Sequence, residues 1–75
     1  MSSWESLANE FDGLSNAAGG VQDDLVDLRQ TIERINEAAG GQISILIAQL
    51  ETLERRIQHQ RNQLQESGQR LDRNS

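Results

Sequence analysis

Apolar residues near the start of this chain recur in steps of three and four, the spacing that marks one face of an α-helix. The face includes both aromatic residues of the sequence, and its members are Trp4, Leu7, Ala8, Phe11, Leu14 and Ala18. Ser2 and Glu5 have the spacing of a capping box, in which the two side chains satisfy free amides at a helix start. The pattern predicts an amphipathic helix over residues 2–17.

Two further segments alternate steps of three and four, which is the signature of a heptad repeat. The apolar positions of the second segment are Val21, Leu25, Leu28, Ile32, Ile35 and Ala39. Those of the third are Ile43, Leu46, Leu50, Leu53, Ile57 and Leu64, with Gln60 replacing an apolar residue. The repeats predict coiled-coil helices over 21–39 and 42–67, followed by a frayed tail over 68–75.

Gly40 and Gly41 separate the two heptad segments and admit two architectures. The apolar positions are mirror images about residue 41, as an antiparallel helical hairpin requires. In such a hairpin the acidic residues 23, 24 and 27 would also lie near Arg55 and Arg56. The alternative is one long helix, because a step of four across the glycines is a stutter that a coiled coil tolerates. The hairpin is the primary prediction.

The segment just after the glycines is apolar around most of the helix, since Ile45 and Ile47 lie outside the heptad seam. A helix that is apolar on several sides is buried on several sides. Two helices do not suffice for this, so we expect a bundle of three or more, completed by the first helix or by another chain. The predicted fold class is all-α, with residues 1–75 forming a single helical unit.

The composition favours a protein that binds other proteins over an enzyme. The chain has 75 residues, a net charge of −5, no cysteine and one histidine, His59, so disulfides and zinc clusters are excluded. Asp23 and Asp27 share a helix face but lack the cleft and the third polar group that acid–base chemistry requires. We therefore predict no catalytic residues, no cofactor, no metal and no enzymatic activity. A chain this small gains only ~3–5 kcal/mol from its own core, which favours assembly with partners.

Membranes and nucleic acids are not the partners that the sequence favours. The chain lacks an N-terminal signal pattern, and its longest apolar stretch, Ile43 to Leu50, is too short to span a bilayer. This leaves the localisation open. Arg55, Arg56 and Arg61 offer contacts to phosphates, but the chain is acidic and has no aromatic residue near them for stacking.

The predicted function is therefore that of a structural or assembly subunit that binds partner helices, from itself or from other subunits. The predicted partner-binding residues are Trp4, Leu7, Phe11, Leu14, Leu25, Leu28, Ile32, Ile35, Ile43, Leu46, Ile47, Leu50, Leu53, Ile57 and Leu64. Two alternatives remain. One is a small acidic regulator or inhibitor of a single target protein, and the other is a helical dimer that binds RNA or DNA through its arginines.

Overall fold

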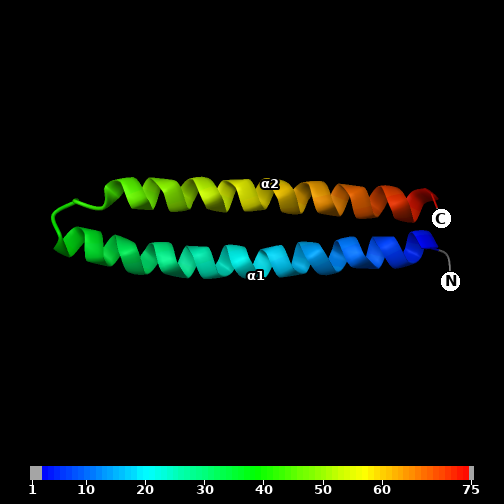
Figure 1. Cartoon of the computed structure of the whole chain (residues 1–75), viewed down its shortest axis with the longest axis horizontal. Coiled ribbons are helices and arrows are strands. Elements are labelled where there is room, and N and C mark those ends of the chain that lie inside the picture. Colours follow the sequence, from blue (N-terminus) through cyan, green and yellow to red (C-terminus); the bar gives the residue numbers. More distant parts are fainter. Residues whose placement is uncertain (1–2, 75) are drawn as a thin grey trace.

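The protein consists of two long helices that lie side by side and run in opposite directions (Figure 1). The computed structural model describes residues 3–74, with α1 spanning Ser3–Ala38 and α2 spanning Ser44–Asn74. These residues contain no strand, and the pair measures 57 × 14 × 10 Å. The all-α prediction is confirmed.

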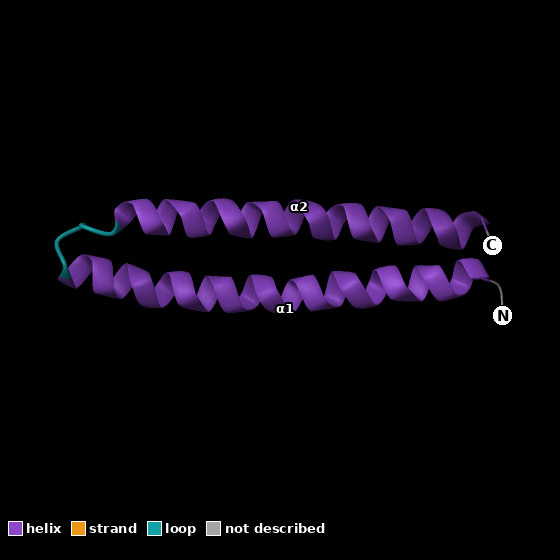
Figure 2. Ribbon diagram, in the orientation of Figure 1, coloured by secondary structure: helices purple, strands orange, loops and turns teal. Residues whose placement is uncertain are grey.

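The chain reverses direction at Gly40 and Gly41, in the short connection between the helices (Figure 2). Both glycines have positive φ angles, 70° and 84°, which side-chain-bearing residues adopt only at a cost. The Gly41 amide donates to the Asn36 carbonyl at 2.9 Å and the Gly40 amide donates to the Glu37 carbonyl at 3.3 Å. This pair of bonds is the Schellman ending of a helix. The alternative of one long helix is therefore wrong.

Asn36 ties the end of α1 to the beginning of α2. Its Oδ1 accepts a hydrogen bond from the Ile43 amide at 2.8 Å, and its Nδ2 donates to the Ser44 hydroxyl at 3.2 Å. That hydroxyl in turn donates to the Gly41 carbonyl at 2.9 Å. One side chain thus satisfies a free amide at the start of α2 and fixes the path of the turn.

The predicted helix end near residue 17 is wrong, because α1 continues through Ala17–Gly20. At Gly19 the absence of a side chain makes room for α2: a Cβ there would lie 3.1 Å from the guanidinium carbon of Arg61. Packing of Arg61 therefore offsets the cost of a helical glycine at position 19, about 1 kcal/mol. The predicted start at Ser2, with its capping box, lies outside the described residues.

The predicted frayed tail over 68–75 is also wrong as far as residue 74, where α2 ends. A Cβ at Gly68 would lie 3.3 Å from the Cβ of Phe11, so the helices approach closely where Gly68 faces α1. Ser15, on the same part of α1, is only 2% exposed. Small residues at this end bring the backbones together, so α2 packs on α1 close to its C-terminal end. Ser75 lies outside the described residues.

Candidate functional site: an apolar face along both helices

The two helices meet through two columns of heptad positions. With Leu25 and Leu50 at position a, the residues at a and e point toward the other helix, and their side chains are mostly buried or half-buried. Position e carries polar and small residues as well as Ile47, and its members are Ala8, Ser15, Gln22, Arg29, Asn36, Ile47, Glu54, Arg61 and Gly68. The hairpin is therefore built on a seam that is apolar at a and largely polar at e.

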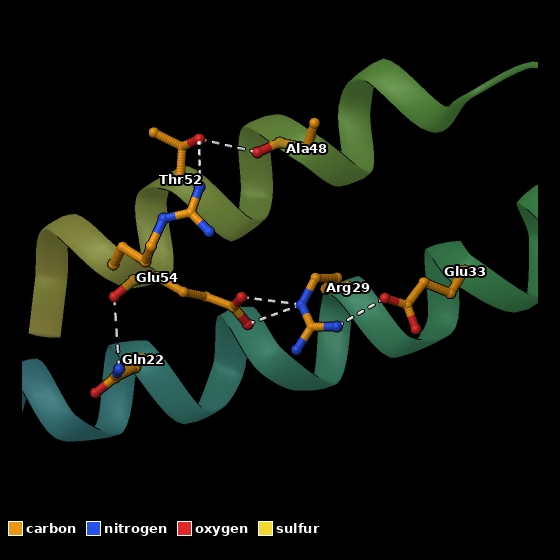
Figure 3. A network of polar contacts seen from close by, with 7 residues as sticks. Gln22, Arg29, Glu33, Ala48, Thr52 and Glu54 are labelled. Atoms are coloured by element: carbon orange, nitrogen blue, oxygen red, sulfur yellow. Dashed lines mark hydrogen bonds and ion pairs between the residues drawn. The ribbon is translucent and has the colours of Figure 1, made fainter.

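Arg29 is the centre of a polar network along the e positions (Figure 3). Its Nε donates to both carboxylate oxygens of Glu54 on α2, at 2.9 and 3.1 Å, and its Nη1 donates to Glu33 at 2.7 Å. The hydrogen bond to Glu33, followed in size of effect by the hydrogen bonds to Glu54, raises the pKa of Arg29 above its ordinary value. The guanidinium is thus a permanent cation that joins the two helices.

Gln22 and Arg61 extend this network toward the termini. The Arg61 Nη1 donates to the Gln22 Oε1 at 2.9 Å, and the Gln22 Nε2 donates to the Glu54 carbonyl at 3.5 Å. Figure 3 shows Gln22 reaching from α1 to this carbonyl. The network establishes that the e positions of both helices lie on one side of the hairpin. We call this side the polar edge.

The opposite side of the hairpin carries position d. In a heptad, d and e lie on either side of a, about 50° away in each direction, so the d residues of both helices share the side that faces away from the polar edge. The large apolar residues at d form what we call the outer apolar face, and they are Leu7, Leu14, Val21, Leu28 and Ile35 on α1 with Leu46 and Leu53 on α2. Each of these seven side chains is 40–57% exposed.

The predicted partner-binding residues thus divide into two groups. One group points into the hairpin or is half-buried beside it: Phe11, Leu25, Ile32, Ile43, Ile47, Leu50, Ile57 and Leu64. The other group remains exposed: Trp4, Leu7, Leu14, Leu28, Ile35, Leu46 and Leu53. Ile45, which the sequence places outside the seam, is the most exposed large apolar residue of the described chain at 76%. It lines a shallow hollow on α2 with Leu53 and Arg56.

The polar contacts between e positions are a feature that the heptad pattern did not predict. The pattern does not pair Arg29 with Glu54, and it predicts instead that the acidic residues 23, 24 and 27 lie beside Arg55 and Arg56. No ion pair joins those two clusters within residues 3–74. The mirror relation about residue 41 contained the necessary signal, because it also brings residue 29 level with the region of residue 54.

The arginines suggested for nucleic acid do not form one patch. Arg61 is engaged with Gln22 at the polar edge and lies against Gly19. Arg55 donates to Thr52 on its own helix at 3.4 Å, and Arg56 lies on the other side of α2, next to the outer apolar face. Of the three arginines suggested for nucleic-acid binding, two are therefore free to contact the phosphates of a nucleic acid.

Residues 3–74 contain no group of three acidic or histidine side chains that could hold a metal ion. Neither described helix is long and apolar enough to cross a membrane. A scan against models of protein families finds no match to this chain, and searches of curated proteins and of solved structures return no similar protein.

Proposed function

We propose that this chain is a non-enzymatic assembly subunit that binds partner helices through its outer apolar face, in a homo-oligomer or a larger complex. The observation that carries the proposal is that the apolar d residues point outward while polar residues at e point inward. A hairpin that functioned alone would gain more by burying a and d, because apolar burial is the main stabilising term. The observed arrangement is favourable when another helix covers d.

The size of the free energy at stake supports the same proposal. Complete burial of a leucine, isoleucine or valine contributes about 1.5–3 kcal/mol, so covering seven half-exposed side chains contributes roughly 5–10 kcal/mol. Within residues 3–74 the apolar side chains that are already buried are those of Ala8 and Leu50. Burial against a partner thus contributes at least as much as the ~3–5 kcal/mol expected of so small a core.

The shape of the face indicates a helical partner. The five residues on α1 recur every seven positions and form one straight stripe along nearly the whole helix. A stripe of this period accepts the knobs of a second heptad-bearing helix. Ile45 widens the apolar surface beside the turn, so the partner contributes contacts on more than one side of α2. A contiguous apolar surface of this kind on a small protein marks an interaction site.

The proposal is tested by site-specific photo-crosslinking in the native source. A benzophenone-bearing amino acid at Thr31, which borders the outer apolar face, is compared with the same group at the neighbouring position Gln30, which points to solvent on the far side. We expect a strong adduct from position 31 alone, with the attachment mapped by mass spectrometry to a helical segment of this chain or of another protein. Equal labelling from the two positions would contradict the proposal.

A further inference from the structure

We infer that the partner on the outer apolar face is a second copy of this chain. The two hairpins form a four-helix bundle in which α1 of each copy lies against α2 of the other, with both turns at the same end. This inference rests on the proposed function and names its partner.

The dimensions of the face fit a second hairpin. The stripe from Leu7 to Ile35 is about 42 Å long at 1.5 Å per residue, and two helices with side chains are about 20 Å wide, so the side of the hairpin that carries the face covers about 800 Å². This is close to the ~800 Å² that each partner contributes to a stable protein interface. A single helix would cover half of this width, whereas a second hairpin covers all of it and exposes an equal face to be covered in return.

Charges beside the face show which helix lies against which. Position g borders the d residues on their outer side. On α1 this column contains the acids Glu10 and Asp24 and no base, whereas on α2 it contains the bases Arg56 and Arg70 and no acid. Asp24 and Arg56 each lack an opposite charge three or four residues away on their own helix. The two columns are therefore complementary between copies, with α1 of one copy meeting α2 of the other.

The register of the hairpin places these charges within one helical turn of the same level. Contacts between the helices join Arg29 to Glu54 and Gln22 to Arg61, and the numbers in each of these pairs add to 83. At the turn, the numbers of Asn36 and Ser44 add to 80. Asp24 with Arg56, and Glu10 with Arg70, also add to 80. A two-fold axis along the length of the hairpin preserves the level, so it sets each acid beside the arginine of the second copy.

The apolar residues follow the same register. Leu28 meets Leu53 of the second copy, and Ile35 meets its Leu46. Toward the termini, α2 presents Gln60 and Ser67 at position d, so the apolar contact is densest in the half of the bundle near the turns. The other face-to-face arrangement, with turns at opposite ends, sets α1 against α1 and α2 against α2. This arrangement leaves Glu10 and Asp24 of α1 without a basic partner.

Charge reversal tests the bundle directly. Purified chain is examined by sedimentation equilibrium as wild type, D24R, R56D and the double variant D24R/R56D. We expect a dimer for the wild type, a dissociation constant about tenfold higher for each single variant, since two symmetric ion pairs become repulsive, and recovery in the double variant. D23R and R55D are matched controls, because both residues are exposed at position f, away from the face, and should leave the dimer unchanged.

A cysteine pair provides a second measurement that does not depend on weak ion pairs. The chain contains no cysteine, so mixing D24C with R56C chains leaves one route to a mixed disulfide. The expected product is a D24C–R56C heterodimer in excess over either homodimer. A chain that stays monomeric overturns the inference but not the proposed function, which then depends on a different partner in the crosslinking experiment. The inference is also overturned if the chain dimerises but its dissociation constant is unchanged by the charge reversals and no mixed disulfide forms.

Discussion

Replacing both turn glycines with alanine should convert the hairpin into a straight helix. Gly40 and Gly41 have φ angles of 70° and 84°, where glycine has no penalty and alanine loses roughly 1–2 kcal/mol per residue relative to the right-handed helix. For G40A/G41A the balance between hairpin and straight helix therefore shifts by about 2–4 kcal/mol, or about 30- to 1,000-fold. The interhelical contacts are not lost, because two straight chains can exchange helices and re-form them between molecules.

Small-angle X-ray scattering distinguishes the two forms whatever the oligomeric state. The hairpin is 57 Å long, and side-by-side association of two hairpins leaves this length unchanged. A continuous helix over the described residues 3–74 is about 110 Å long at 1.5 Å per residue. The expected result is thus a maximum dimension near 110 Å for G40A/G41A, with the helical circular dichroism of the wild type retained or increased.

The matched control is Gly20→Ala. Gly20 lies inside α1 with nothing within 4 Å of an added Cβ, so alanine adds helix propensity without changing the shape. Its maximum dimension should stay near that of the wild type. The reasoning fails if G40A/G41A also keeps the wild-type dimension, because the turn would then not depend on the left-handed glycines.

Three further changes test the packing of the hairpin. Leu50→Ala, at a side chain only 6% exposed, should lower the free energy of unfolding by about 2–5 kcal/mol in urea titrations, whereas Ile45→Ala at 76% exposure should change it by less than about 0.5 kcal/mol. Gly20→Ala should raise the melting temperature, whereas Gly68→Ala, whose added Cβ would lie 3.3 Å from the Cβ of Phe11, should lower it. Equal shifts in the two variants would show that α2 does not touch α1 at Gly68. Asn36→Ala should cost about 1–2 kcal/mol by leaving a helix-start amide unsatisfied, measured as the loss of hydrogen-exchange protection in the turn.

The sequence was sufficient to predict the all-α class and the reversal at Gly40 and Gly41, because heptad spacing and paired glycines act locally. The prediction that the first helix ends before Gly19 and Gly20 is wrong, because the structure continues the helix through both residues. Helix propensity makes each glycine about 1 kcal/mol less favourable than alanine, but it takes no account of Arg61, which packs where the Cβ of residue 19 would be. The same is true of Gly68, since its contact with Phe11 is visible only when both helices are in place.

Six of the seven residues of the outer apolar face, all but Val21, are among the predicted partner-binding residues, but the heptad pattern does not predict how the apolar positions divide between the two sides. A seam of a and d positions is the ordinary interpretation of a heptad repeat, and it treats Leu25 and Leu28 as equivalent. The structure separates them: Leu25 is half-buried beside α2, while Leu28 is 47% exposed. The division depends on how far each helix is rotated about its own axis, and a rotation of about 50° exchanges d for e at the interface. Periodicity alone does not determine so small an angle.

The residues at e explain why the helices take this rotation. Turning both helices to bury d would separate Arg29 from Glu54 and Arg61 from Gln22, and it would replace the close approach at Gly68 by bulky contacts. The same turn would cover the outer apolar face and leave nothing for a partner. Polar pairs and small residues at e thus make one orientation specific, and apolar residues at d remain for assembly. The hairpin thus uses positions a and e for contacts between its own helices, and position d is left to bind a partner.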